Sequence, residues 1–217
     1  MSTGGELGER RRERLDRARL YVVTGARSAE GDLAAFLEAI LEAGADIVQL
    51  REKDAEAGDL LRWGEVFAEA ASRHGALFAL NDRPDVALAL GADAVHVGQN
   101  DLPVDVVRRL VGTDVLIGLS THDVRQLRGT DPAADYLSVG PVHATPTKPG
   151  RPATGLEFVR AAAREASRPW FAIGGIDAET VTDVVGASAR RICVVRAVTE
   201  APDPGRAVRE LRSRLPD

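Results

Sequence analysis

Short apolar runs recur along the chain, and each run is followed by a stretch with the spacing of an amphipathic helix. The runs are rich in Val, Ile and Leu at consecutive positions, which is typical of strands buried on both faces in a parallel sheet. They occupy residues 20–24, 46–50, 76–80, 93–97, 115–119, 135–139, 170–173 and 191–195. The pattern therefore predicts eight buried strands.

The stretches between the runs carry the start and stop signals of helices. The stretch 33–43 ends at Gly44, and the stretch 60–74 ends at Gly75. Proline is favoured near the first turn of a helix and glycine just past its last turn. Further helix starts are expected at Pro84, Pro103, Glu179 and Pro204. Strands that alternate with helices predict a parallel sheet.

An internal repeat supports this alternation. Residues 44–48 (GADIV) resemble residues 91–95 (GADAV), and residues 133–137 (AADYL) resemble both. Each copy marks a helix end that runs into a strand. Eight such units that close on themselves give an α/β fold, the (β/α)8 or TIM barrel. The rival is an open doubly wound sheet, which more often carries a glycine-rich fingerprint after its first strand, and residues 22–25 (VVTG) contain none.

Length and charge limit the number of domains and the kinds of partner that we expect. The chain has 217 residues, which suits a single barrel domain, since such barrels run from about 200 residues upward. We expect a charged amino-terminal extension over residues 1–18 and the catalytic barrel over residues 19–217. The net charge of −5 gives no basic surface for nucleic acid, so no nucleic-acid partner is expected.

The sequence favours a cytoplasmic location. Cys193 is the one cysteine, so no internal disulfide can form, and its apolar surroundings predict a buried structural residue. The first 18 residues lack the apolar segment of a signal peptide, and their acidic side chains argue against a transit peptide. No apolar run is long enough to span a bilayer, so no membrane partner is expected.

Candidate chemistry lies just after the predicted strands, because barrels of this class hold their active sites at the carboxyl ends of the strands. After the second strand, Gln49, Arg51 and Lys53 share one face of the extended chain. Two cations and an amide on one face predict a site for an anionic ligand. The alternative is a solvated patch with a salt bridge to Glu52, and the position at a strand end favours the anion site.

Two carboxylates, Asp82 and Asp101, follow neighbouring strands. With room for water, such a pair suits Mg²⁺, which takes one or two carboxylates plus substrate phosphates rather than a full protein cage. For each residue alone, the alternative is a helix cap ahead of Pro84 or Pro103. Because both carboxylates are expected beside the cations Arg51 and Lys53, metal binding is favoured over helix capping.

The later loops add hydroxyls, glycines and one lysine. Ser120 follows the fifth strand, and residues 140–155 form a segment too long for a plain connector, so we expect an active-site lid there rather than an irregular surface loop. The pairs 174–175 (GG) and 195–196 (VR) follow the last two strands. Loops at these two positions are the recurrent phosphate site of the fold.

The histidines are less informative. His96 faces either the pocket or the core. The other three, His74, His122 and His143, lack the spacing of metal ligands, so no zinc site is expected.

Taken in order, these motifs resemble those of the thiamine-phosphate synthase family. The matching stretches are residues 49–53 (QLREK), 81–82 (ND), 96–101 (HVGQND), 118–120 (GLS), 140–141 (GP), 145–148 (TPTK) and 173–176 (IGGI). They are spread from about residue 20 to the carboxyl end, so no short motif carries the resemblance alone. Two positions depart from the family pattern: Asn100 stands in place of Glu or Ser, and Arg196 stands where many relatives have Ser.

The resemblance implies a transferase of thiamine biosynthesis. Its substrates would be hydroxymethylpyrimidine pyrophosphate and a thiazole phosphate, and its products would be thiamine phosphate and pyrophosphate. The family is thought to react through a pyrimidine cation. The resemblance also implies Mg²⁺ as the cofactor, with Asp82 and Asp101 as its ligands.

The resemblance assigns roles to individual residues as well. The catalytic residues would be Arg51, Lys53, Ser120 and Lys148. The pyrophosphate would be held by Arg51, Lys53, Asn81 and Lys148, with Gln49 and Ser120 near the pyrimidine. The thiazole phosphate would be held by Thr145, Thr147, Gly175, Val195 and Arg196. The substrate-binding stretches also include Leu50, Glu52 and Pro146.

Two other functions fit a barrel of this kind. A metal-independent thiazole tautomerase would use His96 or His122 as its acid–base group and would need no carboxylate pair. A ligand-sensing barrel without catalysis would lack some of the catalytic side chains at the carboxyl ends of its strands. The carboxylates together with the cations argue against both functions. The sequence leaves open whether copies of the chain form a homo-oligomer.

Overall fold

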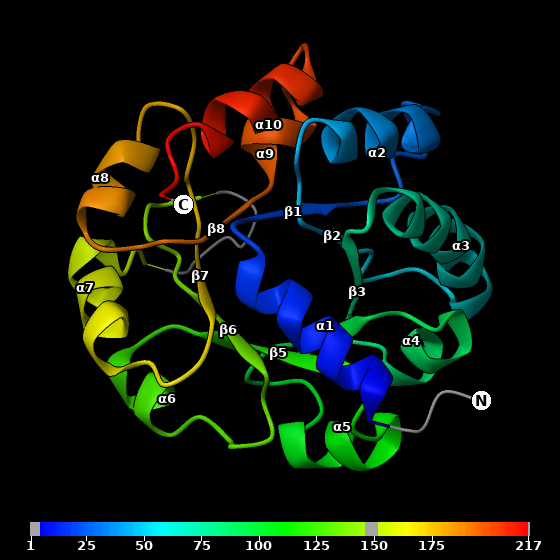
Figure 1. The fold of residues 1–217 in the computed structure, drawn as a ribbon, viewed down its shortest axis with the longest axis horizontal. Coiled ribbons are helices and arrows are strands. Elements are labelled where there is room, and N and C mark those ends of the chain that lie inside the picture. Colours follow the sequence, from blue (N-terminus) through cyan, green and yellow to red (C-terminus); the bar gives the residue numbers. More distant parts are fainter. Residues whose placement is uncertain (1–4, 146–151, 217) are drawn as a thin grey trace.

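The strands close into a barrel. The computed structural model describes residues 5–145 and 152–216. Within them the strands follow one another around the ring in sequence order, every neighbouring pair is parallel, and β8 pairs with β1. Helices surround this ring (Figure 1). The predicted single-domain (β/α)8 barrel is confirmed, and the open sheet is excluded.

The strand bounds agree closely with the apolar runs. The strands are β1 (Leu20–Thr24), β2 (Ile47–Leu50), β3 (Leu77–Asn81), β4 (Ala94–Val97), β5 (Leu116–Thr121), β6 (Tyr136–Val139), β7 (Trp170–Ile173) and β8 (Ile192–Val194). Two of them extend past the predicted ends, because Asn81 and Ser120 still pair with the neighbouring strand. These two polar residues are therefore held by the sheet itself.

The helices are α1 (Glu6–Arg17), α2 (Leu33–Glu42), α3 (Ala57–His74), α4 (Pro84–Leu90), α5 (Val104–Val111), α6 (Val124–Arg128), α7 (Gly155–Glu165), α8 (Val181–Gly186), α9 (Arg196–Thr199) and α10 (Pro204–Arg212). Helices α3 and α4 end at glycines in the left-handed conformation, Gly75 (φ 66°) and Gly91 (φ 63°). Only glycine adopts that backbone without strain, so the helix end predicted at Gly75 is confirmed, and Gly91 ends α4 in the same way.

Apolar side chains form two layers. The larger layer lies between the strands and the surrounding helices. The smaller layer fills the barrel interior with Tyr21, Ile47, Leu77, Leu116, Tyr136, Phe171 and their neighbours. Successive strand residues alternate between the two layers, which explains why whole runs are apolar.

The amino-terminal extension contributes to the interior. Helix α1 contacts β3 and β5, and it crosses the ring of strands in the view of Figure 1. Its Leu15 is only 2% exposed and packs with the interior cluster. This helix covers the amino ends of the strands, opposite to the face where the chemistry is expected.

Removing the side chain of Leu15 should destabilise the barrel. We expect Leu15→Ala to lower the free energy of unfolding by about 2–3 kcal/mol, because it leaves a cavity at the end of the interior layer. Urea denaturation measures this change. Leu7→Ala on the same helix is the control, since Leu7 is 39% exposed. Equal losses in both variants would contradict the role given to Leu15.

The aspartate of each internal repeat links two strands. Asp46 accepts hydrogen bonds from the backbone N–H of Leu20 (2.9 Å), and Asp93 accepts one from Phe78 (3.0 Å). Asp135 accepts one from Ile117 (2.8 Å). Each carboxylate thus ties the start of an even-numbered strand to the strand before it. The repeat is explained by this structural role.

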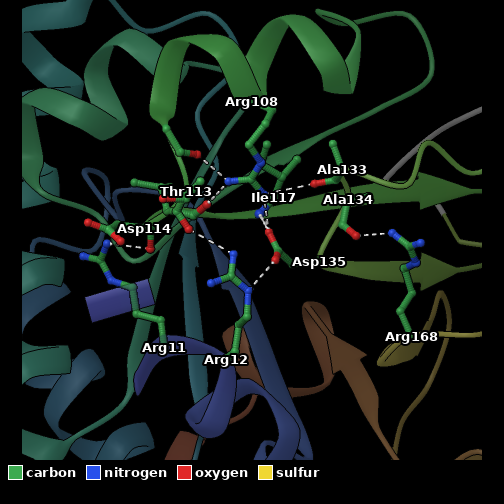
Figure 2. A network of polar contacts seen from close by, with 12 residues as sticks. Arg11, Arg12, Arg108, Thr113, Asp114, Ile117, Ala133, Ala134, Asp135 and Arg168 are labelled. Carbon is green, nitrogen blue, oxygen red and sulfur yellow. Dashed lines mark hydrogen bonds and ion pairs between the residues drawn. The ribbon is translucent and has the colours of Figure 1, made fainter. Parts of the chain in front are cut away.

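Arginines pair with these partly buried carboxylates. Asp135 lies between Arg12 of α1 (3.0 Å) and Arg108 of α5 (2.5 Å), as Figure 2 shows. Asp93 accepts from Arg11 of α1 at 2.7 Å. The charges of residues 1–18 therefore hold α1 onto the barrel.

Candidate active site

Residues from β2, β3, β4 and β5 meet at the carboxyl ends of the strands. They line a cavity of about 70 Å³. Its walls include the predicted residues Gln49, Arg51, Lys53, Asn81, Asp82, Asp101, Ser120 and Val195. Residues far apart in the sequence, such as Val23 and Val195, share this cavity because parallel strands all end at the same rim. The structure thus brings the predicted anion and metal residues together.

The two carboxylates lie beside each other and beside a cation. Lys53 Nζ is 3.2 Å from Asp82 Oδ2, and Asp101 Oδ2 accepts from the Gly98 backbone N–H at 2.8 Å. Burial raises the pKa of Asp82 above its ordinary value, and the neighbouring Asp101 carboxylate raises it further, whereas Lys53 opposes the shift. A carboxylate with a raised pKa favours a partner cation, so the donor set fits a hard divalent metal.

Neither carboxylate caps a helix. The cap residue of α4 is Arg83 and that of α5 is Pro103, and neither helix receives a side-chain cap. The capping alternative is therefore wrong for both aspartates.

The backbone of Asp82 is strained. Its φ of 62° lies in the left-handed region, and its N–H donates to the carbonyl of His96 at 2.9 Å. Asp and Asn adopt this conformation more readily than other non-glycine residues, at a cost in energy. The strain directs the Asp82 carboxylate from β3 toward the loop after β4. Strain of this kind is concentrated at functional sites.

Removing the charge of Asp82 should stabilise the metal-free protein. A carboxyl whose pKa is raised in the folded state favours folding below its unfolded pKa, and this contribution is lost as the pH rises through the folded pKa. We therefore expect Asp82→Asn to raise Tm at pH 7 by a few degrees at most. The gain should shrink as the pH falls through the raised pKa of the folded state, and it should be lost below about 4, the ordinary pKa of an aspartate.

Thermal unfolding at several pH values, without added metal, measures this effect. Asparagine tolerates the backbone conformation of Asp82, so the variant isolates the charge. A lower Tm for the variant at pH 7 would contradict the prediction.

A second cavity, of about 290 Å³, lies beside the first under the ends of β5 to β8. Its walls include the predicted residues Ser120, Thr145, Gly175, Val195 and Arg196. Ser120, Ser138, Ile173 and Val195 line both cavities. Two compartments that share a wall can hold two ligands with their reacting ends together.

Glycines shape the floor of the second cavity. Gly174 and Gly175 have φ of 105° and 63°, and a Cβ on Gly175 would lie 2.7 Å from the Cβ of His143. The Gly174 carbonyl accepts from the His143 N–H at 2.9 Å, which joins the loops after β6 and β7. The Gly175 N–H donates to no acceptor among the described residues. It is available to an anion, as expected of a phosphate site.

A chain of polar side chains crosses the barrel interior. Gln49 Nε2 is 2.7 Å from the Tyr21 hydroxyl, which lies 3.2 Å from the Tyr136 hydroxyl. The Tyr136 hydroxyl is 3.3 Å from His96 Nδ1, and His96 Nε2 is 3.0 Å from Ser120 Oγ. His96 thus both lines the first cavity and belongs to a buried network.

Sequence analysis did not single out Tyr21, Tyr136 or Ser138. The two tyrosines lie within apolar strands and are fully buried, as ordinary core residues are. The only available signal was a phenolic hydroxyl on the inward-facing side of a strand.

Some predicted residues lie elsewhere. The Leu50 side chain is fully buried in the outer layer, and Glu52 Oε1 accepts from the Ala26 N–H at 2.7 Å, which fixes the loop after β1. Arg196, by contrast, lines the second cavity and approaches Glu200 at 3.9 Å. The predicted residues Pro146, Thr147 and Lys148, and with them the central part of the expected lid, lie outside the described residues.

The described residues were also compared with the requirements of a metal cluster and of a membrane-spanning helix. Across residues 5–145 and 152–216, no cluster of three or more His, Cys, Asp or Glu side chains is placed to hold a metal. Over the same ranges no helix has the length and apolar character needed to cross a membrane.

Comparison with known proteins identifies the family. The family model described as thiamine monophosphate synthase matches residues 20–198. A thiamine-phosphate synthase of Acidothermus cellulolyticus is 57% identical over 91% of this chain and 95% of its own length. One from Saccharopolyspora erythraea is 54% identical over 94% of this chain and 96% of its own length.

Solved structures agree. The thiamine phosphate pyrophosphorylase from Pyrococcus furiosus has a TM-score of 0.83 and 31% identity, and the match covers 94% of this chain and 96% of that protein. A 3-hexulose-6-phosphate synthase has a TM-score of 0.67 at 19% identity over 91% of this chain and 100% of its own length, which shows the fold alone.

Fold and relatives together define a (β/α)8-barrel transferase, and its candidate active site lies at the carboxyl ends of the strands. The chain belongs to the thiamine monophosphate synthase family. It forms thiamine phosphate.

Proposed function

We propose that the chain joins hydroxymethylpyrimidine pyrophosphate to a thiazole phosphate and releases pyrophosphate, with Mg²⁺ as cofactor. The observation that carries this proposal is the pair of adjoining cavities. One contains two carboxylates and two cations, and the other contains glycine loops suited to a phosphate. Their common wall at Ser120 and Val195 is where the two reacting groups would meet.

Asp82 and Asp101 would hold the Mg²⁺. Two carboxylates without a third protein ligand leave positions for pyrophosphate oxygens, which is the usual arrangement for this ion. Bound Mg²⁺ would supply charge neutralisation on the leaving pyrophosphate. Lys53, 3.2 Å from Asp82, would then be released toward the same phosphate oxygens.

The protein's own groups would bind and orient both substrates. Arg51, Lys53 and Asn81 would hold the pyrophosphate, together with Lys148. The bond between the pyrimidine methylene and the pyrophosphate oxygen breaks, and its electron pair leaves with the pyrophosphate. The thiazole nitrogen then donates its electron pair to the resulting cation. No proton transfer is required, so the site needs fixed positive charge rather than a strong base.

The thiazole phosphate would lie in the second cavity. The Gly175 N–H, which donates to no described residue, and the side chains of Thr145 and Arg196 would contact its phosphate, with Thr147 completing the set. The thiazole ring would face the common wall at Ser120. A tautomerase would need neither the carboxylate pair nor the cations of the first cavity.

The proposal is tested by direct measurement of pyrophosphate release. We expect release only when both substrates and Mg²⁺ are present, with an equal amount of thiamine phosphate. Release with the pyrimidine substrate alone would indicate hydrolysis, and a change in the thiazole alone without metal would indicate the tautomerase. Either result as the main reaction would overturn the proposal. The cytoplasmic location stays a prediction, and the oligomeric state stays open.

A further inference from the structure

The buried chain from Gln49 to Ser120 has a direction. An amide nitrogen donates hydrogen bonds and accepts none, so the Tyr21 oxygen accepts from Gln49 Nε2 at 2.7 Å. The one phenolic proton of Tyr21 is then directed to the Tyr136 oxygen, 3.2 Å away. The Tyr136 proton in turn is directed to His96 Nδ1, at 3.3 Å.

The direction of these hydrogen bonds determines which atoms of His96 and Ser120 donate and which accept. With Nδ1 accepting, neutral His96 carries its proton on Nε2 and donates it to Ser120 Oγ at 3.0 Å. Ser138 Oγ also donates to Ser120 Oγ, at 3.3 Å. Ser120 therefore accepts twice from the protein, and its own proton remains for the cavity that it lines.

Both phenols remain protonated, so each has one proton to donate along the chain. Burial raises the pKa of Tyr21 and of Tyr136 above the ordinary value. At the other end of the chain, Gln49 Oε1 accepts no hydrogen bond from a described residue, and Gln49 lines the same cavity. The cavity thus presents an acceptor from Gln49 and a donor from Ser120.

We propose that Tyr136 is a positioning residue that passes the direction set by the Gln49 amide on to His96 and Ser120, and thereby makes the site select an aminopyrimidine over the corresponding oxopyrimidine. The proposal rests on the proposed function for its pyrimidine substrate. An amino group beside a ring nitrogen offers a donor and an acceptor, which match Gln49 Oε1 and the Ser120 hydroxyl. An oxo group beside a ring N–H offers the reverse, and both contacts would be mismatched.

The opposite orientation of the Gln49 amide would reverse every bond and would favour the oxopyrimidine. The tautomer of His96 distinguishes the two directions. In the full-length protein labelled with ¹⁵N-histidine, we expect His96 to be protonated on Nε2 at neutral pH, with its signals identified by their absence in His96→Asn. Protonation on Nδ1 would overturn the proposal.

The second measurement is the selectivity of Tyr136→Phe. The ratio of kcat/KM for the aminopyrimidine pyrophosphate to that for its oxo analogue should fall by about tenfold or more, because the Gln49 amide and the His96 proton can then reverse. A purely structural defect would lower both values and leave the ratio unchanged. An unchanged ratio in the folded variant would overturn the proposal.

Thr121→Val is the matched control. Thr121 is fully buried on β5 beside Ser120, and its hydroxyl donates to the Ser138 carbonyl, outside the chain described above. This variant should keep the wild-type ratio. If Tyr136→Phe does not fold, the His96 tautomer of the wild-type protein still decides the proposal.

Failure of the proposed function is distinguishable from failure of this inference. The first appears as the absence of pyrophosphate release by the wild-type protein with either pyrimidine. The second appears as normal release with the wrong His96 tautomer or with an unchanged ratio in Tyr136→Phe.

Discussion

We expect Asp82→Ala to lower the rate of thiamine phosphate formation by roughly 100-fold, which corresponds to about 3 kcal/mol in the activation barrier. The carboxylate of Asp82 lies 3.2 Å from Lys53 and beside Asp101, at the point where pyrophosphate and Mg²⁺ would bind. Its loss removes one of two proposed metal ligands. The rate should be measured over a range of Mg²⁺ concentrations, since a weakened site also requires more metal.

Two companion variants make this result specific. Asp82→Asn keeps a residue that tolerates the φ of 62°, so it separates loss of charge from loss of backbone conformation. Asp85→Ala removes a nearby carboxylate that is 63% exposed and paired with Arg83, and it should leave the rate unchanged. Near-normal activity in both Asp82 variants would show that the metal site is misassigned.

The second large effect concerns stability. We expect Asp135→Ala to lower the free energy of unfolding by about 3–5 kcal/mol, as is usual when one partner of a buried ion pair is removed. The Asp135 side chain is only 11% exposed and accepts hydrogen bonds from Arg12, Arg108 and the Ile117 N–H. Without it, the Arg108 guanidinium is left buried with less compensation. Denaturant unfolding measures the loss.

The matched control is Asp105→Ala on α5. Asp105 is 52% exposed and pairs with Arg109 one turn away on the same helix, so its removal should change stability little. A loss in Asp135→Ala no larger than that in the control would contradict the role proposed for the repeated aspartates.

The fold followed from the sequence because a barrel strand is buried on both sides. Most inward and outward positions must be apolar, so a strand reads as a nearly continuous apolar run, as in residues 20–23 (LYVV) and 170–173 (WFAI). Helix ends were marked by glycines such as Gly75 and Gly91, whose left-handed backbone excludes most other residues. These are local requirements, and local sequence meets them.

The polar residues at the rim of the site could also be predicted from the sequence. Polar residues directly after buried strands have few structural reasons to be there, and the barrel brings all of them to one end. Gln49, Lys53 and Asp101 do share one cavity. Sequence analysis favoured metal binding over helix capping for Asp82 and Asp101, and the observed caps, Arg83 and Pro103, exclude capping.

The sequence by itself determined the order of strands and helices, the closed barrel and the family. Only the tertiary structure decided which residues act together. The Tyr21 and Tyr136 hydroxyls meet across the barrel although 115 positions separate them in the chain. The repeated aspartates accept from neighbouring strands and from α1. Such contacts depend on the radius and register of the closed barrel, and no short stretch of sequence encodes these distances.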